Sequence, residues 1–274
     1  MFNKLKEYKG FKFVLPSFIG FLLLYIVPFF GGFKVSFSKT AFNKGFVGFA
    51  NYLYVLDSSA FQLAAKNTAL FMIIAFPLII VLSFFLALCI YELNIPKMIK
   101  LFIVIPIAIP SAAVAGFFKR AFGVTGWNLL DSEYALFVVI LIFLWKNTGY
   151  NLIIYLAGMS QINKSAIEAA SIDGANYLEK LRYIIIPLLT PTTVIVGIIT
   201  IINSFKVFKD ILMIQGRYPN PKIYMLQHYL TNKYLSLKYH HLTAAAYIFT
   251  LVILAIVFLF LLMDRKYAKK VGEK

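Results

Sequence analysis

The sequence consists mainly of long apolar stretches separated by short polar segments. A helix needs about 20 mostly apolar residues to cross a hydrocarbon core about 30 Å thick. Stretches that approach this length lie at residues 13–33, 68–91, 101–118, 135–157, 192–214 and 244–263. Because unpaired backbone groups are too costly in lipid, each stretch is predicted to be a helix. The pattern therefore predicts an all-α integral membrane protein with six transmembrane helices.

The first apolar stretch follows a lysine-rich leader at residues 1–12. A secretory signal peptide also begins with basic residues, but its apolar region is only about 7–15 residues long and ends at a small-residue cleavage site. The stretch at 13–33 is longer, and Lys34 follows it. It is therefore predicted to be an uncleaved transmembrane helix.

An even number of helices places both termini on the same side of the membrane. Lysine and arginine collect on the cytoplasmic side, close to the ends of the helices. The loops show this bias only mildly, but the terminal segments at 1–12 and 264–274 are short, strongly basic and next to a helix. Both termini are therefore predicted to be cytoplasmic.

Composition supports a membrane protein and limits its partners. Of the residues, 61% are hydrophobic and 14% are charged, whereas soluble domains have about 25% charged residues. The net charge of +16 would suggest nucleic acid binding in a soluble protein, but beside membrane helices it favours anionic lipid headgroups. Membrane lipids are expected as partners, and nucleic acid is not. Cys89 is the single cysteine, which excludes an internal disulfide and a cysteine-built metal cluster.

Residues 158–191, between the fourth and fifth apolar stretches, are predicted to form a helical hairpin. Ser165 and Glu168 have the spacing of a capping box, which begins a helix, and Gly174 stands where a helix commonly ends in a left-handed turn. A second short helix is predicted at 176–185, ending because Pro187 blocks its continuation. Apolar residues on such an exposed segment imply a covering partner, so a docking role is expected.

The hairpin contains a characteristic set of residues, namely Glu168, Ala169, Ala170, Asp173, Gly174, Ala175, Ile184 and Pro187. These residues resemble the Glu-Ala-Ala loop of permease subunits in binding-protein-dependent ABC importers. In that family the loop forms coupling helices that sit in a cleft of the ATPase subunit. The resemblance implies a permease domain at 68–263 with a cytoplasmic helix-elbow-helix coupling loop.

Other motifs are similar to the carbohydrate-uptake branch of this family, in particular to its maltose-type and glycerol-phosphate-type first permeases. They are Pro16, Gly20, Tyr25 and Pro28, the segments 46–48 and 51–52, and the segment 145–151. The segment 215–219 departs from the Gly-Gly-Pro turn that is common in the branch. The resemblance implies a bacterial cytoplasmic membrane protein that imports a sugar. Its implied partners are a second homologous permease, two ATPase subunits and an extracytoplasmic sugar-binding protein.

The chain itself is not expected to be an enzyme. It contains no Gly-x-x-x-x-Gly-Lys-Ser/Thr loop, which is the sequence that holds nucleotide phosphates. No cofactor is therefore expected in this chain, and ATP with Mg²⁺ would bind to the partner ATPase. No metal site is expected either, because the adjacent His240 and His241 lack a carboxylate or cysteine at ligand spacing.

Polar residues within the apolar stretches are candidates for a sugar path, because in-span polar groups usually face the bundle interior. A sugar needs hydrogen-bond partners and an aromatic face, and the candidates are Trp145, Asn147, Asn151, Asn203, Ser204 and Phe205. Hydrogen bonding between helices explains such residues equally well. Lys206 and Asp210 are one turn apart and are predicted to neutralise each other. Pro106 and Pro110 are predicted to kink the third helix.

An ion-coupled secondary transporter is the main alternative function. Such proteins tend to show internal repeats and membrane-embedded carboxylates, whereas this chain has no evident repeat and only Asp210 within a predicted span. An intramembrane enzyme would need a catalytic constellation inside the spans, and none is visible in the sequence.

Overall fold

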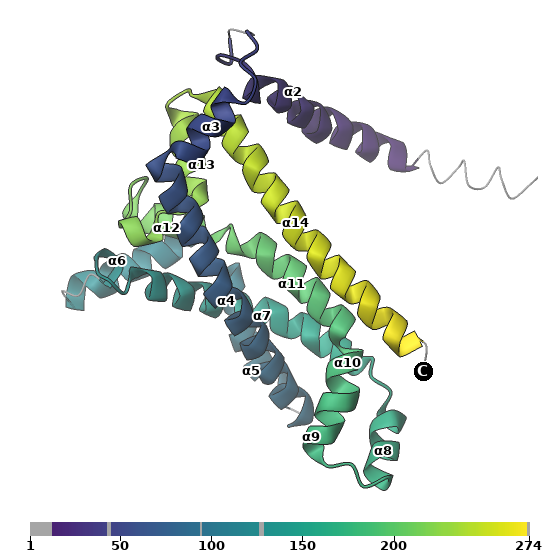
Figure 1. Cartoon of the computed structure of the whole chain (residues 1–274). Coiled ribbons are helices and arrows are strands. Elements are labelled where there is room, and N and C mark those ends of the chain that lie inside the picture. The colour runs from purple at the N-terminus through teal and green to yellow at the C-terminus, as the bar shows by residue number, and fades with distance from the viewer. Residues whose placement is uncertain (1–12, 43–44, 94, 126–128, 273–274) are drawn as a thin grey trace, which may run out of the picture. The chain divides into compact units, whose positions relative to one another are not determined.

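The computed structural model in Figure 1 describes residues 13–42, 45–93, 95–125 and 129–272. Its named elements are all helices, which confirms the all-α prediction for this part of the chain. The predicted basic leader at 1–12 lies outside the described residues. The main helices are α2 (Val27–Ser36), α3 (Ala50–Asp57), α4 (Ser59–Glu92), α5 (Lys97–Val104), α6 (Ser111–Thr125), α7 (Ala135–Ser160), α8 (Lys164–Ile172), α9 (Tyr177–Lys180), α10 (Ile186–Leu188), α11 (Thr190–Ser204), α12 (Val207–Gln215), α13 (Leu226–Leu235) and α14 (Tyr239–Gly272).

Within the described residues, four helices are long and apolar enough to cross a membrane. They are Phe13–Ser36, Ser59–Glu92, Ala135–Ser160 and Tyr239–Leu262, and each contains one of the predicted stretches or most of it. Two further pairs of helices, each bent at a short break, are also long and apolar enough when the two members of a pair are taken together. The number of spans in the described residues is therefore between four and six. The bent pairs correspond to the third and fifth predicted spans.

The third predicted span, at 101–118, is not one continuous helix. The segment Met98–Ala108 is bent by 93° relative to Ser111–Ala121. The break lies at Ile109, whose backbone is extended, because a residue that precedes a proline is disfavoured in the helical region. Pro110 therefore breaks this segment, a larger effect than the predicted kink. Pro106 is accommodated in the tighter helical turn η2 (Ile105–Ala108).

The chain divides into two compact units, which are described separately. Unit 1 consists of residues 1–61 and 230–251. In this unit, Asn51 on α3 donates hydrogen bonds from its side-chain amide to the carbonyls of Ser36 (2.9 Å) and Ser38 (2.8 Å). The hydroxyl groups of Ser36 and Tyr52 are also hydrogen-bonded, at 2.7 Å. These bonds join the end of α2 to α3 through the intervening loop.

Unit 2 consists of residues 62–229 and 252–274 and contains the hairpin and all six residues of the candidate path. Its core has two clusters of buried side chains. The first contains Phe71, Ile79, Val139, Phe143 and Ile211, and the second contains Leu88, Leu152, Tyr155, Met159 and Ile185. In lipid, close packing rather than release from water holds such helices together, so side-chain fit decides the stability of this unit.

A close backbone approach lies at Gly149, in the middle of α7. A Cβ atom placed on this glycine would overlap the carbonyl oxygen of Ile103 and would lie 2.7 Å from the Cα of Val104. Only a residue without a Cβ lets α7 pass this close to the backbone of α5. The glycine therefore determines how α7 packs against the first half of the bent third span.

Replacing Gly149 by alanine is expected to lower the free energy of unfolding by about 1–3 kcal/mol, the usual cost of overpacking a core. The midpoint of thermal unfolding in detergent should fall accordingly. Gly116→Ala is the matched control, since a Cβ at that helical position meets no atom within 4 Å and alanine favours helix. Equal midpoints for the two variants would contradict the close approach.

Candidate functional site

The first helix of the hairpin, α8, has a different cap from the predicted one. Asn163, and not the pair of Ser165 and Glu168, begins the helix: its side-chain oxygen accepts hydrogen bonds from the Ser165 amide (3.0 Å) and hydroxyl (2.9 Å). An asparagine is as effective an N-cap as serine. The predicted capping box at Ser165 is therefore wrong, and the carboxylate of Glu168 stays exposed.

The glycine elbow is confirmed. Gly174 has a φ of +85°, a conformation that residues with a side chain rarely adopt. The amide of the following Ala175 donates to the carbonyl of Ala170 at 2.9 Å, which closes the helix end in the manner of a Schellman motif. No atom lies within 4 Å of where a Cβ on Gly174 would be. The glycine is therefore required by the backbone conformation and not by a close neighbour.

The second arm of the hairpin is longer than predicted. Its capping box is formed by Asn176 and Glu179, and both of its hydrogen bonds are present, at 2.7 and 3.0 Å. Pro187 does not stop this helix, because a π-helical segment at Leu181–Ile185 precedes it and such a widened turn relieves the clash of a proline with the preceding carbonyl. The helix continues to Leu188, and a bend of 63° follows before Thr190.

The hairpin has two faces. Ile167, Leu181 and Ile185 pack into the second core cluster, where they meet side chains from the ends of α4 and α7. Among the sequence-predicted coupling residues, Glu168, Ala169, Asp173 and Gly174 are exposed, and Ala170, Ala175, Ile184 and Pro187 are half-buried. The structure also exposes large apolar side chains that the prediction missed, namely Ile172, Leu178 and Tyr183.

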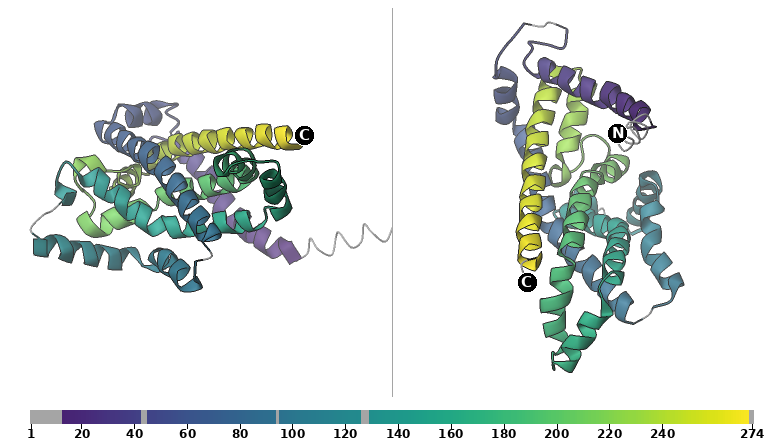
Figure 2. Two further views of the ribbon diagram at one scale, coloured as in Figure 1. Left: turned by 90° about the horizontal axis from the view of Figure 1, so that it is seen from below. Right: turned by 90° about the vertical axis from the view of Figure 1, so that its right-hand side faces the viewer.

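Two polar contacts hold the hairpin in position, one to α4 and one between its own arms. The hydroxyl of Tyr177 donates to the carboxylate of Glu92 at the end of α4, at 2.8 Å. The ammonium of Lys180 donates to the hydroxyl of Ser171 at 3.1 Å, which joins the two arms. The hairpin is thus held by α4 and by its own two arms. Figures 1 and 2 show the path of α8, α9 and α10 between α7 and α11.

The polar candidates in the spans fall into separate groups. On α7, Asn151 is buried and donates to the hydroxyl of Thr200 on α11 at 2.9 Å, a residue that the sequence prediction did not include. Asn147 donates to the carbonyl of Phe143 in its own helix at 2.9 Å. Trp145 is exposed. Of these three candidates, Asn151 is the one whose bond to α11 the structure shows, and Tyr155 of α7 adds a second bond there by donating to the Thr193 hydroxyl at 3.3 Å.

The candidates on α11 lie at the point where this helix breaks. Asn203 and Ser204 are buried, and the hydroxyl of Ser204 donates to the carbonyl of Ile201 at 2.6 Å. Ser204 and Phe205 line a narrow cleft with Thr68, Phe208 and Gln227. Next to Phe208 lies His228, 4.6 Å between ring centres, and burial lowers the pKa of this histidine to about 4.

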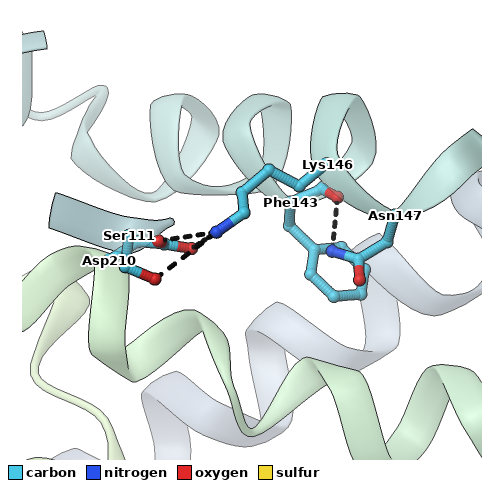
Figure 3. Close-up of polar contacts among 5 residues, drawn as sticks. All are labelled: Ser111, Phe143, Lys146, Asn147 and Asp210. Atoms are coloured by element: carbon cyan, nitrogen blue, oxygen red, sulfur yellow. Dashed lines mark hydrogen bonds and ion pairs between the residues drawn. The ribbon is translucent and has the colours of Figure 1, made fainter. Parts of the chain in front are cut away.

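The predicted pairing of Lys206 with Asp210 is wrong. Asp210 is paired instead with Lys146 on α7, at 2.8 Å, and both side chains are largely buried, with exposed fractions of 6% and 14%. Figure 3 shows that the Lys146 ammonium also reaches the hydroxyl of Ser111 at the start of α6. Lys206 bonds to the side-chain oxygen of Asn203 at 2.9 Å. The ion pair thus crosses between helices, and Asp210 does not neutralise Lys206.

Comparison with known families identifies what the chain is similar to. The family of binding-protein-dependent transport system inner membrane components matches it over residues 79–273. An arabinooligosaccharides transport system permease protein of Bacillus subtilis is 29% identical over 75% of this chain and 71% of the relative. A trehalose/maltose transport system permease protein of Thermococcus litoralis is 29% identical over 79% of this chain and 80% of the relative.

A solved structure supports the fold. A chain of a bacterial ABC transporter involved in the import of the acidic polysaccharide alginate superposes with a TM-score of 0.78 at 23% identity. The match covers 96% of this chain and 97% of that chain. At this level of identity, the likeness shows the fold alone.

Replacing Asp210 by asparagine is expected to lower the free energy of unfolding by about 3–5 kcal/mol, because the Lys146 ammonium would stay buried without its partner. Thermal unfolding of the purified protein in detergent measures the effect. Glu133→Gln is the matched control: it breaks the exposed ion pair with Lys222, which contributes about 0–1 kcal/mol. A similar small shift for both variants would rule out a structural role of the Asp210 pair.

Proposed function

Since the chain belongs to the family of binding-protein-dependent transport system inner membrane components, we propose that it is the transmembrane permease subunit of an ABC importer for a sugar or oligosaccharide. The observation that carries this proposal is the hairpin of α8 to α10, with its glycine elbow and its exposed outer face. The similar proteins named above are permeases for arabinooligosaccharides and for trehalose and maltose, which favours a sugar as the solute.

A separate ATPase subunit would drive this permease by docking on the hairpin. The exposed surface joins the charges of Glu168 and Asp173 to the apolar side chains of Ile172 and Leu178, and an exposed apolar group on such an element suits a partner's groove. The opposite face is packed against the ends of α4 and α7. A movement of the docked ATPase would therefore pass directly into these two helices.

The proposed topology has six spans, with each bent helix pair counted as one, and both termini in the cytoplasm. This arrangement places the hairpin on the cytoplasmic side, where ATP with Mg²⁺ binds to the ATPase. The proposed assembly contains a second homologous permease, two ATPase subunits and an extracytoplasmic sugar-binding protein. The sugar path would run along Trp145, Asn147 and Asn151 of α7 and along Asn203, Ser204 and Phe205 at the end of α11.

The ion-coupled secondary transporter gains no support. Asp210 is the acid that its mechanism would use, but the carboxylate is held at 2.8 Å from the Lys146 ammonium. The carboxylate is therefore already engaged in a contact between α7 and α12, which leaves it poorly placed to bind a coupling ion.

Gly174→Asp is expected to leave the protein inserted and folded but to abolish its association with the ATPase. An aspartate at a φ of +85° strains the elbow by about 1–2 kcal/mol and adds a charge to the docking face. Co-purification of the ATPase and substrate-stimulated ATP hydrolysis are the measurements. Glu168→Lys should have the same effect by reversing a charge on that face.

The control is Glu133→Lys, which reverses an exposed charge far along the chain from the hairpin and should leave both readouts unchanged. If ATPase association and uptake are normal in both hairpin variants, the hairpin is not the docking element.

A further inference from the structure

One face of α11 and α12 is left uncovered and carries two lysines. Its exposed side chains recur every three or four positions, as expected for one side of a helix, and they are Ile202, Lys206, Lys209 and Met213. The other side of the same helices is buried and includes Asn203, Val207 and Asp210. The two lysines therefore occupy the middle of a surface that the rest of this chain does not cover.

The charges of these lysines are not compensated within the described part of the chain. Its ion pairs join Lys146 to Asp210 and Lys222 to Glu133, and neither includes Lys206 or Lys209. Asp210 is the single acid between residues 190 and 215, and it is already neutralised. Lys206 bonds only to the neutral amide oxygen of Asn203. This segment of the span thus carries two surplus positive charges.

Contact with lipid headgroups does not account for the exposed charge of Lys206. In a helix, side chains lean toward the N-terminus, and the N-terminus of α11 is the cytoplasmic end in the proposed topology. The ammonium of Lys206 follows this direction, because it lies 2.9 Å from Asn203, one turn earlier. The 15 residues of α11 rise about 22 Å at 1.5 Å each, which is less than the thickness of the hydrocarbon core. Lys206 thus points back into the membrane and away from the outer surface.

Charged side chains within membrane spans usually line the path of a solute or pair with a charge on a partner, and they rarely face lipid. The residues next to Lys206 suit a sugar. The side-chain oxygen of Asn203 accepts from the Lys206 ammonium, and an amide also bonds to hydroxyl groups. Phe205 precedes Lys206 and is half-buried, and it lines a cleft that Lys206 and Lys209 do not line. A saccharide with a negative charge would pair with the lysines and bond through its hydroxyls to the neighbouring amide.

We propose that Lys206 and Lys209 bind the carboxylate or phosphate of an anionic saccharide, so that the transported solute is an acidic sugar. This inference rests on the proposed function and specifies its substrate class. Ammonium groups pair with either anion, so a uronate and a sugar phosphate remain the two forms to separate by experiment.

The test uses the complete importer, with its second permease, ATPases and binding protein, in proteoliposomes. Uptake is measured for three probes: digalacturonate, a hexose 6-phosphate and the neutral disaccharide maltose. One of the anionic probes should be taken up and maltose should not. The variant Lys206→Gln/Lys209→Gln should lower that uptake about tenfold or more, because hydrogen bonds to charged groups are lost, while ATPase association stays normal.

The matched control, Lys39→Gln/Lys222→Gln, removes two exposed charges that are not part of this face and should transport like the wild type. Uptake of maltose alone, unchanged in the Lys206→Gln/Lys209→Gln variant, overturns the proposal. Loss of the second permease from the purified variant complex also overturns it, because the lysines would then pair with a carboxylate of that partner. If no anionic probe enters while Gly174→Asp still uncouples the ATPase, the acidic substrate is wrong and the proposed function stands.

Discussion

A backbone N–H or C=O group that stays unpaired in hydrocarbon costs several kcal/mol, and the architecture of this chain follows from that cost. It explains why the described elements are helices, and it explains why the backbone changes its conformation just before Pro110 and Pro187. Pro110 follows an extended residue and breaks the third span by 93°. Pro187 is preceded by a π-helical segment, so its helix continues. In both places the missing donor is accommodated by a local change of backbone.

Polar side chains in the spans follow the same rule, since they too need partners. Asn151 is bonded to Thr200, and Asp210 is paired with Lys146, so α7 is held to α11 and α12 by polar contacts as well as by packing. Lys206 and Lys209 are the exception on the uncovered face. Their charges are left for a solute, and this separates the structural polar residues of the bundle from the functional ones.

Much of the fold and part of the site could be predicted from local sequence. The apolar stretches predicted the helices, and Gly174 predicted the elbow, because a positive φ at a helix end needs a glycine and no distant contact. The predicted cap at Ser165 was wrong because Asn163, two residues earlier, competes for the same amide groups. The predicted stop at Pro187 was wrong because a widened helical turn absorbs a proline. Both errors concern local alternatives that residue spacing alone does not distinguish.

The sequence by itself determined the class of this protein, its helical segments and the hairpin with its family resemblance, since each depends on residues within a few turns of one another. Only the tertiary structure decided which partner Asp210 takes. Lys206 lies one turn away and Lys146 lies 64 residues away, yet the distant lysine forms the pair because packing of α7 against α12 brings it within 2.8 Å in a buried site. Packing of the hairpin against the ends of α4 and α7 likewise turns Ile167 and Ile185 inward and leaves Ile172 and Leu178 exposed. Sequence spacing shows which residues share a helix face, but the neighbouring helices decide which face is covered.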